Sequence, residues 1–341
     1  MRIAIDAMGG DHAPKEIIEG ALLALKEDPT LELVVVGSEE AFAEYLPEDT
    51  PRVEKVISHS VMAMDESVEN LRKKRDSSIY LANQVVKEGK ADAVISCGST
   101  AAQLAAAILV LGRIKGVKRP AIVVPYPTLD GHRVMLDGGA NVDIDANIMT
   151  EFAVLGSSYA RLISGEIHPE VVLLSNGTEE HKGTAVVRET HQRLKNLSSL
   201  NFKGNIEGRD IMKGEYDVLV TDGFTGNVVM KVTEGVASGL FKLVKKEITA
   251  TTSRKIGAAL VKPGLKNIAK MFDYNNYGGT PLLGVNGISV VCHGSSKAEA
   301  VKNAVFAAEK FIKQDFIGVL REDIAAYHES QKESEEVENN E

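Results

Sequence analysis

One stretch, residues 92–113, constrains the fold of this chain more than any other. After Asp92 comes the apolar run Ala93-Val94-Ile95, which is long enough for a strand buried on both faces. Gly98 ends this run, and Ser99 or Thr100 can cap the helix that the strong helix formers after them predict. A strand, a turn and a helix in this order direct free backbone N–H groups and the positive end of a helix dipole at one point. The stretch therefore predicts either a phosphate-binding turn or an ordinary connection in a parallel sheet.

The same pattern of a short apolar run followed by helical periodicity repeats along the chain. Strands are expected at residues 3–6, 33–36, 93–95, 121–124, 133–136, 171–174, 217–220 and 288–291. Helices are expected at residues 16–25, 79–88, 101–111, 150–163 and 298–312, with another after residue 227. This alternation predicts an α/β fold with a mostly parallel sheet, in which ligands bind at the carboxyl ends of the strands.

Several of the expected strands end in glycine beside small or polar residues. These turns are Met8-Gly9-Gly10, Cys97-Gly98-Ser99-Thr100, Asp137-Gly138-Gly139, Asp222-Gly223 and His293-Gly294-Ser295-Ser296. A sheet built only for stability does not need so many glycine-rich ends on one side. Together they predict a polar, glycine-lined cleft for an anionic group.

Composition excludes several other classes of protein. The chain has 341 residues, 44% of them hydrophobic, and a formal net charge of −9, which argues against a nucleic-acid partner. Its two cysteines, Cys97 and Cys292, lack the spacing of a structural zinc site, and no metal is expected. The amino terminus lacks a signal-peptide pattern, and no apolar run is long enough to span a membrane. We therefore expect a cytoplasmic protein.

The sequence also lacks the motifs of several common enzymes. It contains no G-x-S-x-G elbow, no G-x-x-x-x-G-K-[ST] loop, no H-E-x-x-H pair and no G-x-G-x-x-G fingerprint. Serine hydrolases, P-loop kinases, zinc peptidases and dinucleotide-binding enzymes each lose their main support.

Long motifs resemble one family, the bacterial acyl-carrier-protein:phosphate acyltransferases, or PlsX family. The opening Ile5-Asp-Ala-Met-Gly-Gly-Asp-His-Ala-Pro-Lys15 carries the resemblance most clearly. It continues at residues 72–78, 127–131, 139–143, 207–210, 222–229, 277–287 and 292–296. The sequence departs from the family pattern in the turn at residues 96–101 and at Gly138, where the family has valine.

The resemblance implies both a reaction and a fold. An enzyme of this family moves a long-chain acyl group from acyl carrier protein to inorganic phosphate without a cofactor, and a glycerol-3-phosphate acyltransferase then uses the acyl phosphate. The implied fold is a three-layer α/β/α sandwich, similar to isopropylmalate dehydrogenases and phosphotransacetylases, that forms a homodimer. The family also implies peripheral association with the inner face of the cell membrane.

Thioester phosphorolysis needs a bound phosphate, a placed carbonyl and a stabilised oxyanion. With the resemblance, we expect Lys182, His12 and Asp222 to be catalytic, although a solvated lysine, a loop histidine and a turn-capping aspartate are the alternatives. The expected phosphate- and substrate-binding residues are Gly9, Gly10, Asp11, Gly98, Ser99, Thr100, Asn141, Asn227, His293, Gly294 and Ser295. A covalent acyl-enzyme on Cys97 is a weaker alternative, since no base is recognisable beside it.

A basic segment interrupts this acidic chain. Residues 242–272 hold eight Lys or Arg against one acid, Glu247, and Pro263-Gly264 predicts two short helices joined at that point. We expect a hairpin at about 240–273 that contacts an anionic membrane or the acidic carrier protein. The expected contacts are Lys255, Ile256, Leu260, Lys262, Leu265 and Lys266. A hairpin that packs a dimer is the alternative.

We expect residues 1–328 to form a single domain and residues 329–341 to form a disordered acidic tail. Three other functions stay open. A phosphotransacetylase acting on coenzyme A would share the fold and the chemistry. A metal-dependent 2-hydroxyacid dehydrogenase would need Asp137, Asp143 and Asp222 to converge, and a membrane-surface scaffold would need only the basic hairpin.

Overall fold

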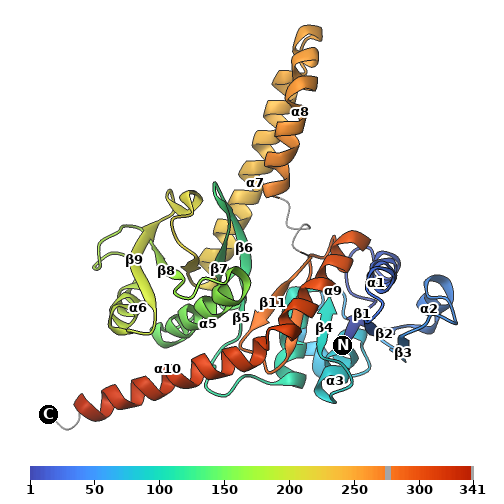
Figure 1. Ribbon diagram of the computed structural model, residues 1–341, viewed down its shortest axis with the longest axis horizontal. Coiled ribbons are helices and arrows are strands. Elements are labelled where there is room, and N and C mark those ends of the chain that lie inside the picture. Colours follow the sequence, from blue (N-terminus) through green and yellow to red (C-terminus); the bar gives the residue numbers. More distant parts are fainter. Residues whose placement is uncertain (273–277, 339–341) are drawn as a thin grey trace.

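The computed structural model describes residues 1–272 and 278–338, and their strands form two sheets (Figure 1). The first sheet has seven strands in the order β3-β2-β1-β4-β12-β11-β5. Their bounds are Val53–Ile57, Glu32–Gly37, Arg2–Asp6, Ala93–Ser96, Ile288–Val291, Thr280–Leu283 and Ala121–Ile122. The second sheet has five strands in the order β6-β7-β10-β8-β9. Their bounds are Val124–Thr128, Gly131–Leu136, Val218–Val220, Glu170–Ser175 and Asn201–Glu207.

Most neighbouring strands are parallel, which confirms the predicted α/β class. Only the pairs β11–β12, β11–β5 and β6–β7 of the described strands are antiparallel. Because parallel strands need crossovers, helices cover the sheet faces. The helices are α1 (Lys15–Glu27), α2 (Glu39–Tyr45), α3 (Ser78–Lys87), α4 (Thr100–Ala106), α5 (Ala146–Ser164), α6 (Ala185–Asn196), α7 (Gly223–Ile248), α8 (Thr252–Met271), α9 (Ala298–Lys313) and α10 (Phe316–Glu338). Short helical segments lie at η1 (Val68–Arg72), at η2 (Ala107–Leu111), which continues α4, and at η3 (Ile211–Lys213).

The side chains of β1 show how the layers form. Ile3 and Ile5 belong to a core cluster that also contains residues of α1 and α9, whereas Ala4 belongs to a cluster with residues of α3. Successive strand residues point to opposite faces, so a strand that is apolar throughout is buried on both sides. The first cluster also includes Leu136 and Val218 of the second sheet, so the two sheets share one core.

The chain passes between the two sheets within a segment predicted as one strand, 121–124. The structure divides it at Val123, with β5 in the first sheet and β6 in the second. The sequence does not reveal this division, because residues 121–124 are all apolar. Val123 is only 1% exposed in the structure, so the chain changes sheets without leaving the core. The prediction of one continuous strand was therefore wrong.

The helices α7 and α8 form a hairpin that projects from the junction of the two sheets (Figure 1). The predicted break at Pro263-Gly264 was wrong, because α8 runs through Pro263 and the tip lies instead at residues 249–251. Proline cannot donate to the carbonyl four residues before it, but that residue, Ala259, is exposed, so water can bond the freed carbonyl. Residue 273, at the end of the expected hairpin, lies outside the described residues.

The carboxyl-terminal segment also differs from the prediction. Residues 329–338 were expected to be disordered, but α10 continues as helix through Glu338. Beyond Gly318 this helix contains neither glycine nor proline, so nothing in the backbone stops it from propagating. Residues 339–341 of the expected tail lie outside the described residues. Within the part of the chain that the structure describes, no helix combines the length and the apolar character that crossing a membrane requires.

Candidate functional site

The turns that follow β1, β4 and β12 meet at the carboxyl edge of the first sheet. Asp11 N donates to Gly294 O at 2.8 Å, which joins the first turn to the third. A side chain on Gly9 would lie 2.7 Å from Gly98 N, so the first two turns approach as closely as their backbones allow. A side chain on Gly10, whose φ is +115°, would lie 3.1 Å from Gly294 O. Glycine at these positions is therefore required by the approach of the three turns.

A buried carboxyl group fixes the floor beneath these turns. Ser96 Oγ donates to Asp6 Oδ2 at 2.7 Å, and Gly98 N donates to Ser96 Oγ at 3.0 Å. Burial raises the pKa of Asp6, although hydrogen bonds from Ser78, Ser96 and the backbone oppose the shift. Asp6 therefore orders the turn at Gly98.

A second buried carboxyl group does the same in the other sheet. Asp137 Oδ1 accepts from the backbone N–H of Ile122, Gly139 and Ala140 at 3.0, 3.2 and 3.1 Å. Its Oδ2 accepts from both Asn141 N and Asn141 Nδ2, at 2.7 and 2.9 Å. Burial raises the pKa of Asp137, and these hydrogen bonds oppose the shift. The Asp137 carboxyl group thus joins the turn after β7 to Ile122, the last residue of β5.

The base of α7 packs directly on this second turn. A side chain on Gly226 would lie 2.1 Å from Asp137 O, and one on Gly223 would lie 2.7 Å from Asn141 N. Only glycine lets the helix approach this closely. One turn further along, Asn227 lies against Gly139. The first turns of α7 are thereby directed into the space between the two sheets.

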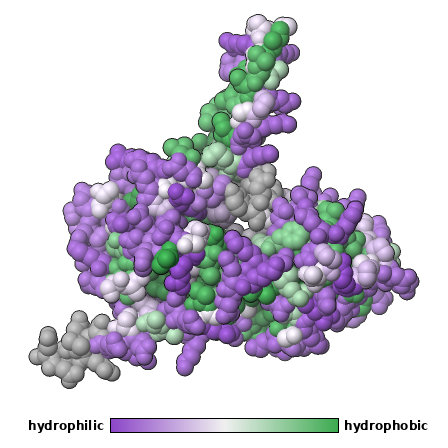
Figure 2. All heavy atoms as spheres, viewed as in Figure 1, coloured by the Kyte–Doolittle hydropathy of each residue, from purple (hydrophilic) through white to green (hydrophobic). Residues whose placement is uncertain are grey.

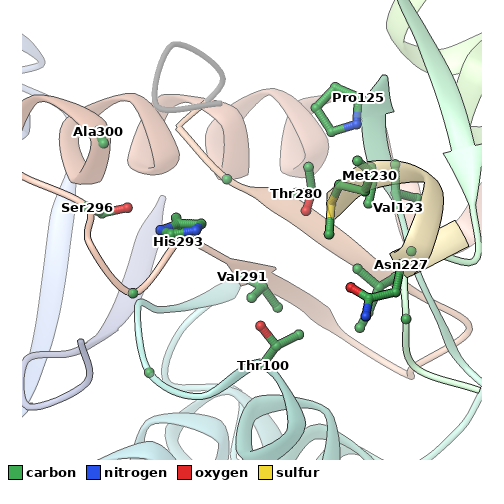
Figure 3. Close-up of a pocket in the computed structure, with 18 of the residues that line it drawn as sticks. Thr100, Val123, Pro125, Asn227, Met230, Thr280, Val291, His293, Ser296 and Ala300 are labelled. Atoms are coloured by element: carbon green, nitrogen blue, oxygen red, sulfur yellow. The ribbon is translucent and has the colours of Figure 1, made fainter. Parts of the chain in front are cut away.

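This space is a cavity of about 430 Å³ lined by residues of both sheets and of α7 (Figure 3). Its size lies within the usual range for small-molecule sites. The turns described above contribute Asp11, Gly98, Gly138, Gly139, His293 and Gly294. Apolar side chains form much of the remaining wall, and they are Ile122, Val123, Val124, Met230 and Val291. The cavity can therefore hold a ligand with a polar and an apolar part.

Ionisable side chains give the cavity its polar character. Lys231 and Glu234 of α7 both line it and form an ion pair of 2.8 Å. His293 Nδ1 accepts from Ser295 N at 3.2 Å, so in the neutral ring the proton lies on Nε2, which can donate to a ligand. Thr100, at the start of α4, adds a hydroxyl on the facing side (Figure 3).

Six of the predicted site residues line this cavity, namely Asp11, Gly98, Thr100, Asn227, His293 and Gly294. Four others, Gly9, Gly10, Ser99 and Ser295, belong to the same turns. The convergence of distant glycine-rich strand ends was predicted from the sequence, and the structure brings these ends together. The binding roles of the individual residues remain predictions.

Four predicted residues are absent from the described lining of the cavity. His12 is exposed, and Lys182 lies in the loop between β8 and α6, outside the described lining of the cavity. Asn141 is buried and donates to Pro120 O at 2.8 Å and to Asp137. Asp222 caps α7, where it accepts from Thr225 N at 2.8 Å and from Thr225 Oγ1 at 2.7 Å. The structure thus shows the expected capping alternative for Asp222, which does not test its catalytic role.

Sequence reasoning missed the cavity residues Met64, Met230, Lys231, Glu234 and Thr280. Three of them could have been found, because residues three, four and seven positions after Asn227 share its face of a helix. Met64 and Thr280 had no such signal, since the tertiary fold alone brings them to the cavity.

Cys97 is buried beside Cys292, on the neighbouring strand end. A hydrogen bond with the Cys292 thiol, together with burial, raises the pKa of Cys97 well above its usual value. A thiol held in its protonated form is a poor nucleophile, which disfavours the acyl-enzyme alternative. Among the described residues, no group of three or more His, Cys, Asp or Glu side chains is placed to hold a metal ion.

The turn at Gly138 packs closely against Val124, the first residue of β6. A side chain there would lie 2.2 Å from Val124 Cγ2, and both residues line the cavity. Val124 therefore occupies the space that a valine at position 138 would need.

Comparison with known sequences gives matches over nearly the whole chain. Residues 1–319 match the family described as "Fatty acid synthesis protein". A phosphate acyltransferase of Desulfitobacterium hafniense is 49% identical over 336 residues, covering 97% of this chain and 100% of the relative. A phosphate acyltransferase of Heliobacterium modesticaldum is 47% identical, covering 95% of this chain and 98% of the relative.

Solved structures with a similar fold are more distant in sequence. A phosphotransacetylase from Streptococcus pyogenes is 20% identical with a TM-score of 0.59, covering 91% of this chain and 94% of that one. A 4-hydroxythreonine-4-phosphate dehydrogenase from Klebsiella pneumoniae is 12% identical with a TM-score of 0.54, covering 92% and 99%. These similarities concern the fold alone.

Proposed function

The chain belongs to the fatty acid synthesis protein family, and from this premise we propose that it is a phosphate acyltransferase. It transfers a long-chain acyl group from acyl carrier protein to inorganic phosphate, and it needs no cofactor to do so. The identity of about half its residues with phosphate acyltransferases supports the reaction. One structural observation carries the proposal, namely that the glycine-rich strand ends of both sheets border a single cavity that also has an apolar wall.

The two sides of the cavity match the two parts of the reaction. Lys231 and the Nε2–H of His293 provide positive charge and a donor for phosphate, beside the first turn of α4. Val123 and Met230 lie together across the cavity from Thr100, where they can contact the acyl chain (Figure 3). A ligand seated there would hold its thioester carbonyl between the anion and the apolar wall.

The chemistry requires placement more than acid–base catalysis. A phosphate oxygen attacks the carbonyl carbon, and the electron pair of the carbonyl moves to its oxygen to form a tetrahedral oxyanion. When the oxyanion collapses, the carbon–sulfur bond breaks, acyl phosphate is released and the thiolate takes up a proton. Donors at the turns after β4 and β12 stabilise the oxyanion, because they are fixed before the substrate binds.

We propose that Lys182 donates the proton to the departing thiolate. It follows β8, which lies parallel to β10 in the same sheet, so it is at the same edge as Asp222 and the base of α7. His12 adjoins Asp11, a cavity residue, and is proposed to contact the incoming phosphate. Asp222 is proposed to act by holding the first turn of α7 in place.

The direct test incubates palmitoyl acyl carrier protein with radiolabelled phosphate. Labelled palmitoyl phosphate above a boiled-enzyme control is expected. Acetyl coenzyme A, assayed in parallel, tests the phosphotransacetylase alternative. If labelled acyl phosphate forms with acetyl coenzyme A but not with palmitoyl acyl carrier protein, the donor is a coenzyme A thioester and the proposed donor is wrong.

We propose that α8 attaches the enzyme to the inner face of the cell membrane. None of the described residues of α8 is buried, and Ile256 and Leu260 are 67% and 80% exposed. Lys255, Lys262 and Lys266 are exposed on the same helix, and Leu265 is half buried. Figure 2 shows hydrophobic surface along one side of the hairpin and hydrophilic surface along the other. This combination favours an anionic bilayer surface, with the acidic carrier protein as the alternative partner.

We propose a homodimer formed through α7. Exposed apolar side chains recur every three or four residues along one face of this helix, at Phe224, Val228, Val232, Val236, Leu240 and Leu243. Val232, Val236, Leu240 and Leu243 of this set lie on the side of the helix away from Asn227 and Lys231, since residues on a helix advance by about 100° each. Light scattering should give twice the chain mass, and the Val232→Glu variant should give the monomer. A glycerol-3-phosphate acyltransferase at the same membrane is the proposed consumer of the product.

A further inference from the structure

A second cavity, of about 210 Å³, adjoins the first. The two cavities share three lining residues, Pro125, Gly279 and Thr280. Pro125 belongs to β6 in one sheet, and Thr280 begins β11 in the other. Figure 3 shows both side chains on the α9 side of the first cavity. The second cavity therefore lies directly beyond the wall that these residues form.

The described lining of the second cavity is mostly apolar. It is formed by Val134 of β7, Tyr159 and Ile163 of α5, and Ala307 and Phe311 of α9. Val134, Tyr159 and Phe311 are only 4%, 7% and 4% exposed, so packing already holds these side chains in place. The rings of Tyr159 and Phe311 lie 6.1 Å apart, which fixes one wall between α5 and α9. This is a preformed apolar recess rather than a loose surface groove.

The polar side chains at its edge are already engaged with backbone carbonyls. His132 Nε2 lies 2.9 Å from Met271 O, and Arg133 Nε donates to Gly214 O at 2.8 Å. Lys310 Nζ donates to Ile163 O at 3.4 Å. Because these groups have protein partners, the recess is better suited to an apolar ligand than to an anion.

We propose that the second cavity receives the distal methylenes of the acyl chain, which reach it from the first cavity past Pro125 and Thr280. This inference rests on the proposed acyltransferase function and goes beyond it, since it assigns the residues that select chain length. A methylene is similar in size to a water molecule, which occupies about 30 Å³ in the liquid, so the recess has room for about seven such groups. A short acyl chain ends within the first cavity, whereas a long chain extends into the second.

Chain length should then determine how much the recess contributes. Each methylene removed from water favours binding about fourfold, from about 0.8 kcal/mol per methylene and 1.4 kcal/mol per factor of ten. Filling the recess should therefore lower kcat/KM for palmitoyl thioester by at least about tenfold. The same change should leave a hexanoyl thioester within about twofold of wild type, because a six-carbon chain does not reach it.

Two substitutions fill the recess from different helices, Ala307→Phe on α9 and Ile163→Trp on α5. Ala307 is half buried and Ile163 is 37% exposed, so neither is a fully enclosed core position. The control is Ala325→Phe, the same change at an exposed position of α10 that lines neither cavity. Palmitoyl and hexanoyl acyl carrier protein are compared with the full chain, and thermal unfolding of each variant shows that it is folded.

A selective loss on palmitoyl substrate in either folded cavity variant, absent from Ala325→Phe, would support the proposal. Unchanged kcat/KM for both chain lengths, or an equal loss on both, would overturn it while leaving the acyltransferase function intact. Binding of the fluorescent fatty acid cis-parinaric acid provides a readout that needs no turnover. If the wild type forms no acyl phosphate from any donor, the proposed function fails. Weaker binding of parinaric acid by Ala307→Phe than by the wild type would still assign the recess to an acyl chain. Equal binding of parinaric acid by the two proteins would contradict the assignment of the recess to an acyl chain.

Discussion

The two halves of α7 do different work although they form one continuous helix. In the first turn, Gly223 and Gly226 are buried against the turn after β7, and the next two turns place Asn227 and Lys231 in the cavity. No residue of α7 after Gly226 is buried among those described, and Val236 and Leu240 are 64% and 58% exposed. Packing therefore fixes the position of the base, while the outer half, with α8, stays exposed. Substitutions should therefore be able to alter the proposed catalysis and the proposed membrane attachment separately.

The largest expected effect comes from removing the charge of Lys231, at the base of α7, and comparing it with the loss of a lysine from the outer half. Lys231→Ala should lower kcat/KM for phosphate about a hundredfold, which is typical of losing one donor to a developing anion. Lys245→Ala, in the last turn of the same helix, should leave activity unchanged. Initial rates against phosphate concentration measure both. Wild-type kinetics in Lys231→Ala would show that the base of α7 has no part in catalysis.

Lys182→Ala provides the companion measurement for the proposed proton donor. A loss of kcat with little change in KM for phosphate is expected if Lys182 protonates the leaving thiolate. Full activity would remove Lys182 from the mechanism and leave Lys231 as the catalytic lysine.

Reversing the charge of α8 should weaken binding to anionic membranes and leave the turnover rate unchanged. Replacing Lys255, Lys262 and Lys266 together by glutamate should weaken binding to phosphatidylserine vesicles by about a hundredfold, at about 1 kcal/mol per basic residue. Replacement of the same residues by arginine keeps the charge and should preserve binding. Vesicle sedimentation measures the effect, and undiminished sedimentation of the glutamate variant would contradict membrane attachment through α8.

Matched glycine substitutions compare the packing of the two halves. Gly226→Ala places a Cβ 2.1 Å from Asp137 O and should destabilise the protein by about 1–3 kcal/mol. Gly239→Ala, with nothing within 4 Å of the new Cβ, should stabilise it by up to about 1 kcal/mol through helix propensity. Denaturant unfolding compares the two. Equal effects would mean that the base of α7 is no more constrained than its outer half.

The smallest effect concerns the cap of α7. Asp222→Ala should cost about 1 kcal/mol of stability, whereas Asp222→Ser, which can also cap, should restore it. If Asp222 acts only by positioning the helix, the serine variant should also restore activity. A folded serine variant that stays inactive would give the carboxylate a direct catalytic role.

Much of the first sheet and of the cavity floor could be predicted from local sequence. The strand at residues 3–6, the glycines after it and the Gly98-Ser99-Thr100 turn depend on apolar patterning and on backbone conformations that few residues adopt. Lys182 illustrates the limit, because a loop lysine after a strand has the same local sequence signature whether or not it enters a site. Lys231 illustrates the converse, since it looks like an ordinary surface lysine until the base of α7 is packed against Asp137.

The sequence by itself determined the α/β class, the glycine-rich strand ends and a basic amphipathic segment, because periodicity, turn chemistry and charge are local properties of the chain. Only the tertiary structure decided that the strands divide into two sheets at Val123, that α8 continues through Pro263, and that Lys231 rather than Lys182 lines the cavity. The two-sheet division and the place of Lys231 depend on contacts between residues far apart in the chain, whose packing energies outweigh the preferences of any single segment. The helix α8 tolerates Pro263 because the carbonyl that the proline leaves without a donor, that of Ala259, is exposed to water.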